Sequence, residues 1–166
     1  GLVCKIFTSA GLQGSGVIVG NRTVVTAGHM LPPEGPWWIR VVPAYFDGAS
    51  LHGANVQSFV SDSRGYRDAG VAGYDWAVLR LYEPLGEWLG FFGFNGYDPD
   101  WEDEPYWTAL GYPGAISSER PSFQTSVSIF DDDSDSNGGQ ELETRADLGP
   151  GNSGGPLLNG RGEVVG

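Results

Sequence analysis

The sequence predicts an all-β fold, and three observations support this class. The chain of 166 residues contains 27 glycines and 11 prolines, which separate short apolar runs. Such punctuation is typical of strands joined by turns. A hydrophobic content of 40% excludes a disordered chain, and no long helical period appears. A chain of this length has room for one sizeable core or for two small barrels that share a cleft.

The apolar runs divide the chain into two groups of strands. In the segment that opens with Asp75, alternate positions from Trp76 onward face opposite sides, as in a half-buried strand. Residues 85–105 are rich in proline, glycine and acidic side chains and are predicted to link a first group in residues 1–84 to a second in residues 106–166. The predicted strands are Val3–Phe7, Ser15–Val19, Thr23–Thr26, Trp38–Val42, Asn55–Val60, Trp76–Leu81, Tyr106–Leu110, Ser122–Phe130, Glu141–Arg145, Pro156–Leu158 and Glu163–Val165.

The charge and the cysteine content narrow the classes of function. A formal net charge of −12 argues against a nucleic-acid partner, which needs basic side chains to neutralise phosphates. No apolar run is long enough to cross a membrane, so no membrane partner is expected. The acidic balance suits an exported, extracellular protein whose leader has been removed or precedes Gly1. Cys4 is the single cysteine and is expected to be a small buried apolar residue.

The most informative motif is Gly151-Asn152-Ser153-Gly154-Gly155-Pro156. Glycines on both sides of a serine allow a tight turn that exposes its hydroxyl while nearby backbone N–H groups point into one cavity. A nucleophile and an oxyanion hole can be built together in this way. Taken alone, the motif is equally compatible with a glycine-rich turn.

Two upstream motifs supply the partners that a serine nucleophile needs. His29 ends the motif Thr-Ala-Gly-His, directly after the apolar run Thr23–Val25, where a strand gives way to a loop. Asp75 opens Tyr-Asp-Trp-Ala-Val-Leu-Arg-Leu at the mouth of a half-buried strand, where a carboxylate can orient an imidazole. A serine hydroxyl is a poor nucleophile near neutral pH, so a histidine must accept its proton and later return it.

Together these motifs, in the order His, Asp, Ser, resemble the trypsin/chymotrypsin superfamily of serine proteases over nearly the whole chain. The resemblance implies a chymotrypsin-like double six-stranded β-barrel and a serine endopeptidase that acts through an acyl-enzyme on peptide or protein substrates. It assigns His29 as the acid/base, Asp75 as its orienting carboxylate and Ser153 as the nucleophile. The N–H groups of Gly151 and Ser153 would form the oxyanion hole, and no organic cofactor is implied.

Finer features of the resemblance favour the glutamyl-endopeptidase-like branch of secreted microbial proteases. Asn152 stands where trypsin-like zymogens carry an aspartate that pairs with a freed amino terminus, so that activation switch is not expected. The alternative is an HtrA-type protease domain, which the stretch Gly14–Val19 and the C-terminal residues resemble. A further alternative is a catalytically silent, protease-like binding module, against which the intact set of three residues argues.

The resemblance gives weaker guidance on the substrate pocket. Asp147 lies six residues before Ser153, where trypsin places the aspartate that receives basic substrate side chains. An aspartate there would attract a cationic side chain, although the microbial branch often carries one without that preference. Leu148 stands where glutamyl endopeptidases commonly use threonine. Asp147 and Leu148 are therefore the candidate pocket residues, and the sequence does not assign the substrate residue that the pocket prefers.

The family pattern continues beyond Gly166, through a strand that pairs with substrate and a terminal helix. We therefore expect the second barrel to be incomplete at the C-terminus, with an unpaired edge. A complementing C-terminal segment or a propeptide is the expected partner.

One acidic loop is a candidate calcium site. Residues 131–138 are rich in side chains that could offer oxygen ligands, but the position that needs a bidentate glutamate in a calcium-binding loop is Thr144. A solvated hairpin loop is the simpler interpretation, and no other metal site is expected. The candidate ligands are Asp131, Asp133, Asp135 and Asn137.

Overall fold

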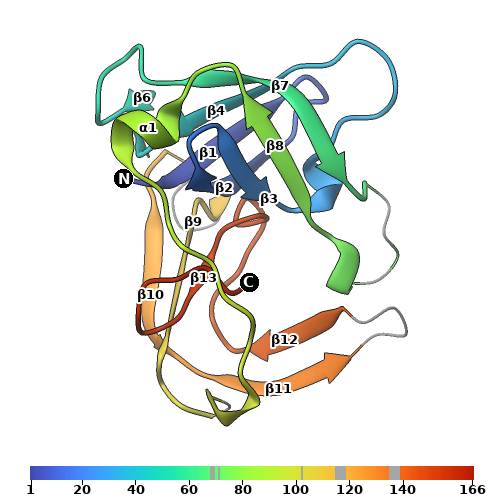
Figure 1. Ribbon diagram of the computed structural model, residues 1–166, viewed down its shortest axis with the longest axis vertical. Coiled ribbons are helices and arrows are strands. Elements are labelled where there is room, and N and C mark those ends of the chain that lie inside the picture. Colours follow the sequence, from blue (N-terminus) through green and yellow to red (C-terminus); the bar gives the residue numbers. More distant parts are fainter. Residues whose placement is uncertain (68–69, 71, 102, 115–118, 135–138) are drawn as a thin grey trace.

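The first half of the chain forms a closed antiparallel barrel, shown in the upper part of Figure 1. The computed structural model describes residues 1–67, 70, 72–101, 103–114, 119–134 and 139–166. Six strands close the barrel in the order β1-β2-β3-β8-β7-β4. Their bounds are Val3–Thr8 (β1), Gln13–Gly20 (β2), Thr23–Thr26 (β3), Ile39–Pro43 (β4), Ser58–Gly65 (β7) and Ala77–Leu81 (β8).

Branched apolar side chains fill the interior of this barrel. Ile6, Ile18, Val24 and Leu79 come from four different strands and are completely buried. Each such side chain stabilises the fold by about 1.5–3 kcal/mol when it leaves water. Val24 lies directly opposite Leu79 in the β3–β8 pair, so the same register that packs the core also fixes the two strands that lead to the candidate site.

The second half is more open. The strands β9 (Trp107–Gly111), β10 (Ser122–Val127) and β13 (Leu157–Leu158) form one sheet, and β11 (Ile129–Ser134) pairs with β12 (Gln140–Thr144) in a separate ribbon. Within the described ranges these strands do not close into a barrel, although the fully buried Trp107 gives them a core of their own. The predicted double-barrel fold with an incomplete second barrel is therefore confirmed.

Several predicted strands differ in detail from those observed. The predicted strand Ser122–Phe130 is observed as two strands, β10 and β11, which separate at Ser128. Within β10 the register against β9 shifts after Gln124, where Ser126 adopts a left-handed φ of 55°. The predicted strand Asn55–Val60 is also observed with other bounds, since β7 begins at Ser58 and continues to Gly65. At the C-terminal end, Val164 forms only isolated bridges, to Phe94 and to Leu158. The short hairpin of β5 (Tyr45–Phe46) and β6 (Ala49–Ser50) was not predicted.

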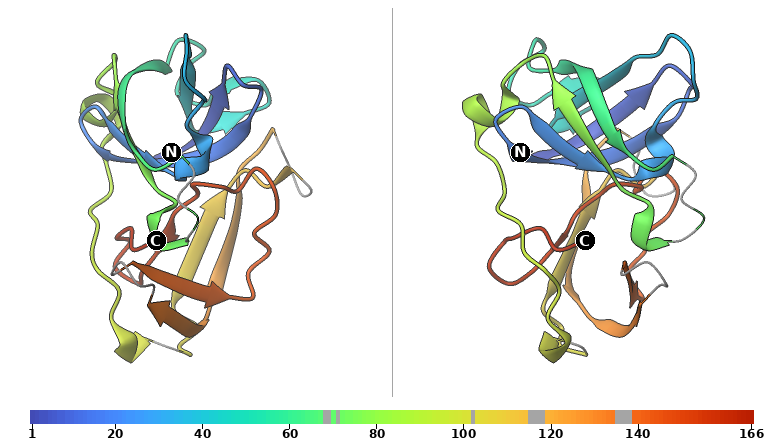
Figure 2. Two further views of the ribbon diagram at one scale, coloured as in Figure 1. Left: turned by 90° about the vertical axis from the view of Figure 1, so that its right-hand side faces the viewer. Right: turned by 45° about the vertical axis from the view of Figure 1, so that its right-hand side comes forward.

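The linking stretch leaves the barrel after β8 and runs down one side of the molecule to the far end of the second half, as both views of Figure 2 show. It contains a single helical turn, α1 (Leu85–Leu89), and the 3-10 turn η3 (Pro99–Trp101). In the described residues, no helix combines the length and the apolar character that a membrane crossing requires.

Candidate active site

His29 lies on a 3-10 turn, η1 (Gly28–Met30), and this turn begins two residues after the end of β3. The turn is packed tightly against neighbouring backbone, because a Cβ added at Gly28 would lie 2.0 Å from the carbonyl oxygen of Tyr66. Only glycine fits at this close approach. The imidazole of His29 is half-exposed, so it remains accessible from solvent.

Asp75 holds His29 through both of its carboxylate oxygens. Oδ1 accepts the His29 backbone N–H at 2.8 Å, and Oδ2 lies 2.7 Å from His29 Nδ1. The topology explains this pairing, since Thr26 at the end of β3 is opposite Ala77 at the start of β8. An ionised carboxylate only accepts hydrogen bonds, so Nδ1 carries the proton and Nε2 keeps its lone pair. The arrangement leaves a base at Nε2.

Ser153 lies on the loop between β12 and β13, and backbone contacts place this loop against the first barrel. The Ser153 carbonyl oxygen accepts a hydrogen bond from the Ser15 amide at 2.7 Å. A Cβ added at Gly154 would lie 2.2 Å from both Ser15 O and Thr26 Oγ1 and 2.8 Å from Ala27 N. The segment after Ser153 therefore packs on the residues that lead directly into the His29 turn, which brings the three motifs to one region.

Hydrogen bonds hold the carbonyl groups of Pro150 and Asn152, which precede Ser153 in the loop. Pro150 O accepts from Gly114 N at 2.7 Å, and Asn152 O accepts from Gly155 N at 2.7 Å. Because a trans peptide points its N–H away from its C=O, these two bonds also orient the amides of Gly151 and Ser153. In the described part of the chain, neither amide donates a hydrogen bond. The amides of Gly151 and Ser153 are thus fixed in direction, and their role as oxyanion-hole donors stays a prediction.

Two cavities adjoin these loops. One, of about 700 Å³, is lined by Asp75, Trp76 and Gly154 among others. The second, of about 510 Å³, lies beside Asn152, and Leu148 is part of its lining.

The two candidate pocket residues differ in their surroundings. Leu148 lines the second cavity, whereas Asp147 is not among the described residues that line it. The backbone of Asp147 is clamped by Gln124, whose amide side chain both donates to and accepts from it. The role of Asp147 in specificity stays a prediction.

A buried lysine joins the two halves of the molecule. Lys5 on β1 is 1% exposed, and its Nζ lies 3.7 Å from a carboxylate oxygen of Glu119, just before β10. Burial lowers the pKa of Lys5, and the charge of Glu119 opposes that shift. The Tyr45 hydroxyl donates to Glu119 at 2.6 Å, and burial together with this bond raises the pKa of Tyr45 to about 12. The carboxylate of Glu119 is therefore tied to the first half of the chain through both Lys5 and Tyr45.

The single cysteine has no role in this site. Cys4 is free and completely buried in the barrel core, as the sequence predicted. Burial raises the pKa of its thiol far above the ordinary value, so it stays protonated near neutral pH.

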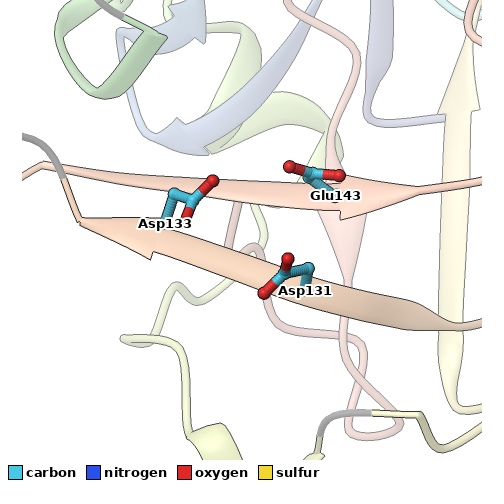
Figure 3. Close-up of side chains that lie close together, drawn as sticks. All are labelled: Asp131, Asp133 and Glu143. Carbon is cyan, nitrogen blue, oxygen red and sulfur yellow. The ribbon is translucent and has the colours of Figure 1, made fainter.

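Three carboxylates converge on the ribbon of β11 and β12, and only two of them were predicted. Figure 3 shows Asp131 and Asp133 from β11 beside Glu143 from β12. Their oxygens lie within 4.8 Å of one another because Asp131 is directly opposite Glu143 in the pair. Asp135 and Asn137, the other predicted ligands, lie outside the described residues. Carboxylates this close can bind a cation, but exposed acidic groups are common without one.

Comparison with known proteins identifies the family. Residues 14–166 match the trypsin-like peptidase domain family, and the chain belongs to that family. The resemblance seen in the sequence is thereby confirmed at the level of the family.

Solved protease structures share the fold. A Glu endopeptidase superposes with a TM-score of 0.77 at 20% identity, over 99% of this chain and 76% of that chain. A thermostable serine protease from an extremophilic microorganism gives 0.73 at 23% identity, over 99% and 81%. The protease Anisep from Arthrobacter nicotinovorans gives 0.70 at 22% identity, over 98% and 79%. At these identities the likeness shows the fold alone, and the solved structures that share this fold are serine proteases.

Two residues that were not predicted from the sequence, Ser15 and Glu143, lie beside the predicted site residues in the structure. Ser15, between two glycines on β2, contacts the Ser153 loop through both its backbone and its side chain. A serine between glycines at a close approach of two segments is a usable signal, but a strand assignment alone does not reveal the partner. Glu143 was missed because its neighbours become visible only once the β11–β12 register is known.

Proposed function

We propose that this chain is a serine endopeptidase in which Ser153 is the nucleophile, His29 the acid/base and Asp75 its orienter. The observation that carries the proposal is the double hydrogen bond from His29 to Asp75, at 2.8 Å from the backbone N–H and 2.7 Å from Nδ1. It selects the tautomer whose Nε2 can accept a proton. Membership of the trypsin-like peptidase family supports a peptidase of the serine type.

In the proposed mechanism, Ser153 Oγ attacks the carbonyl carbon of a peptide bond while its proton passes to His29 Nε2. The carbonyl oxygen becomes an oxyanion. The C–N bond then breaks, the leaving amine takes the proton from His29, and the acyl group stays on Ser153 as an ester. A water molecule, deprotonated by His29, attacks this ester and releases the acid and the free serine hydroxyl. Asp75 stabilises the imidazolium that forms in both halves of the cycle.

The amides of Gly151 and Ser153 would bind the oxyanion. Their orientation by the hydrogen bonds at Pro150 O and Asn152 O supports this role, since donors that are already aligned need no reorganisation during the reaction. Removing one such donor typically lowers kcat by about 10²–10³-fold.

Two alternatives make different predictions. An HtrA-type protease domain would use the same three residues, so it differs in substrates and partners rather than in chemistry. A silent binding module would keep the fold but would not hydrolyse peptides. The ordered pair of His29 and Asp75 favours an active enzyme, because a module without turnover has no need of an oriented base. We further propose an extracellular location, for which the acidic composition is the support.

The test is hydrolysis of a quenched-fluorescent peptide library by the purified chain and by Ser153→Ala. The variant should lose about 10³–10⁶-fold in kcat while it keeps the circular dichroism spectrum of the parent chain. Ser61→Ala is the matched control, because Ser61 is an exposed residue of β7 whose hydroxyl, among the described residues, bonds only to the Arg80 carbonyl. Retained hydrolysis by Ser153→Ala would exclude this mechanism, and a folded parent chain without hydrolysis would favour the binding module.

A further inference from the structure

Ser15 is a buried serine that touches the Ser153 loop through its side chain as well as its backbone. Its hydroxyl oxygen lies 2.9 Å from Tyr112 N, which donates to it, and 2.9 Å from Gly151 O. Its amide donates to Ser153 O at 2.7 Å. The residue is completely buried on β2 of the first barrel. One side chain thus connects the barrel to the loop that carries the proposed nucleophile.

We propose that Ser15 is a positioning residue, whose hydroxyl holds the peptide between Gly151 and Asn152 and thereby aligns the two oxyanion-hole amides. This inference rests on the proposed function of Ser153 and names the group on which the alignment of its loop depends.

The direction of each hydrogen bond follows from the partners. Because the Tyr112 amide donates to Ser15 Oγ, the single hydroxyl proton is left for the carbonyl oxygen of Gly151. A buried carbonyl or amide that loses such a partner is destabilised more than the net value of an ordinary hydrogen bond. The hydroxyl therefore stabilises one orientation of the Gly151 carbonyl over a rotated one.

The held peptide lies between the two that carry the oxyanion donors. The preceding peptide bears the Gly151 N–H and is fixed by the bond from Gly114 to Pro150 O, and the following one bears the Ser153 N–H and is fixed at Asn152 O. The other end of the middle peptide donates only within the loop, from Asn152 N to Gly149 O at 3.1 Å. Its tie to the first barrel is the Ser15 hydroxyl.

Gly151 needs such an external tie. Its φ is 94°, and an added Cβ would lie 2.5 Å from Tyr112 O, so a side chain cannot be accommodated there. Glycine is also the residue whose adjacent peptides rotate most freely, because no Cβ restricts φ and ψ. The same feature that lets the loop approach the barrel leaves the peptide dependent on a hydrogen bond from outside.

Ser15 is also connected to the histidine side of the site. Its carbonyl oxygen accepts a hydrogen bond from Thr26 Oγ1 at 2.8 Å, and Thr26 lies three residues before His29. The loop that carries Ser153 and the strand that leads to His29 are therefore both hydrogen-bonded to Ser15. A change in the Ser15 side chain is expected to disturb the oxyanion amides without removing any of the three proposed catalytic residues.

The experiment compares Ser15→Ala with Ser58→Ala. Ser58 is 3% exposed, and its hydroxyl likewise accepts from one amide, Glu83 N at 2.9 Å, and donates to one carbonyl, Phe59 O at 2.8 Å. Both variants lose the same kind of buried bridge, and only Ser15 contacts the Ser153 loop. The midpoint temperature of thermal unfolding should fall by a similar amount in both variants.

Kinetic parameters separate positioning from stability. Ser15→Ala should lower kcat by about 10- to 100-fold with KM within about 2-fold, below the effect of removing an oxyanion donor outright. A peptide phosphonate or boronate that occupies the oxyanion hole should lose a similar factor in affinity. Ser58→Ala should keep the parent kcat, and Ser15→Thr, which retains a hydroxyl, should restore most of it.

The outcomes distinguish this inference from the proposed function. If the parent chain is active and Ser15→Ala has the same kcat, or Ser58→Ala loses as much, Ser15 is only structural and the inference is wrong. A parent chain that folds but does not hydrolyse peptides contradicts the proposed function instead. Should Ser15→Ala fail to fold, Ser15→Cys keeps the side-chain volume with a weaker donor and is subject to the same comparison.

Discussion

The two halves of the molecule hold their proposed catalytic residues in different ways. In the first barrel, paired strands bring His29 and Asp75 together, since the end of β3 faces the start of β8. In the second half, Ser153 lies on a loop that is held from two sides, by Ser15 of the first barrel and by backbone groups at and after β9 of its own half. The base is thus positioned by the register of two paired strands, and the nucleophile by a loop that contacts both halves across their interface.

This difference separates two kinds of sensitivity. A change in the His29–Asp75 pair alters the chemistry and leaves the position of the two halves unchanged. A change at the interface alters the distance between the two halves. A closed barrel has no free edge and buries a continuous core, so local substitutions there are expected to leave the arrangement of the strands intact. The position of the open second half depends more on single contacts with the first barrel, such as those made by Gly154 and Glu119.

The largest effect is expected from Asp75→Asn. The amide cannot accept both hydrogen bonds from His29 in the same way and favours the wrong tautomer, so kcat should fall by about 10⁴-fold with little change in stability. Steady-state hydrolysis and thermal unfolding measure the two quantities. Asp62→Asn is the control, since Asp62 is an exposed carboxylate that bonds to its neighbour Ser63 N. Equal activity of Asp75→Asn and the parent would show that Asp75 does not orient the base.

A smaller effect is expected at the interface, from Gly154→Ala. The new methyl group would overlap Ser15 O and Thr26 Oγ1, so the Ser153 loop must move away from the barrel. We expect a loss of about 1–3 kcal/mol in stability and of about 10²-fold in kcat.

Gly162→Ala is the matched control for this prediction. Gly162 has φ 75° and Gly154 has φ 82°, but nothing lies within 4 Å of a Cβ at Gly162. The two variants share the backbone strain and differ in the clash. Identical losses in both would contradict the close packing of the two halves.

The smallest effect concerns a surface ion pair across the same interface. Arg120 lies 2.6 Å from Asp47 Oδ2, and its guanidinium holds the pKa of Asp47 below the ordinary value of 3.8. Since the unfolded chain binds this proton more readily, the pair stabilises the fold above about pH 4 and loses that contribution as pH falls through the lowered pKa.

The variant Asp47→Asn should therefore be slightly less stable than the parent at neutral pH, and the difference should shrink as the pH falls below about 4. Urea unfolding of both proteins across this range measures it. A difference that stays constant with pH would mean that the ionisation of Asp47 does not contribute.

The sequence predicts the fold class and the candidate triad because their signals are local. His29 and Asp75 each adjoin an apolar strand, and the glycines around Ser153 indicate a tight turn. The contacts that join these segments are not local, since the role of Ser15 depends on which loop its strand meets. The irregularity of β10 around Ser126 was missed for a related reason, because a register shift appears only once the partner strand is known.

The most direct test of the assembled site is covalent labelling with a fluorophosphonate, followed by mass spectrometry of the purified chain. The account predicts one adduct on Ser153, which disappears in His29→Ala and persists in His52→Ala, the variant of the other histidine in the chain. A folded protein that is not labelled, or is labelled on Ser153 equally well without His29, would contradict the claim that the two halves form one catalytic site.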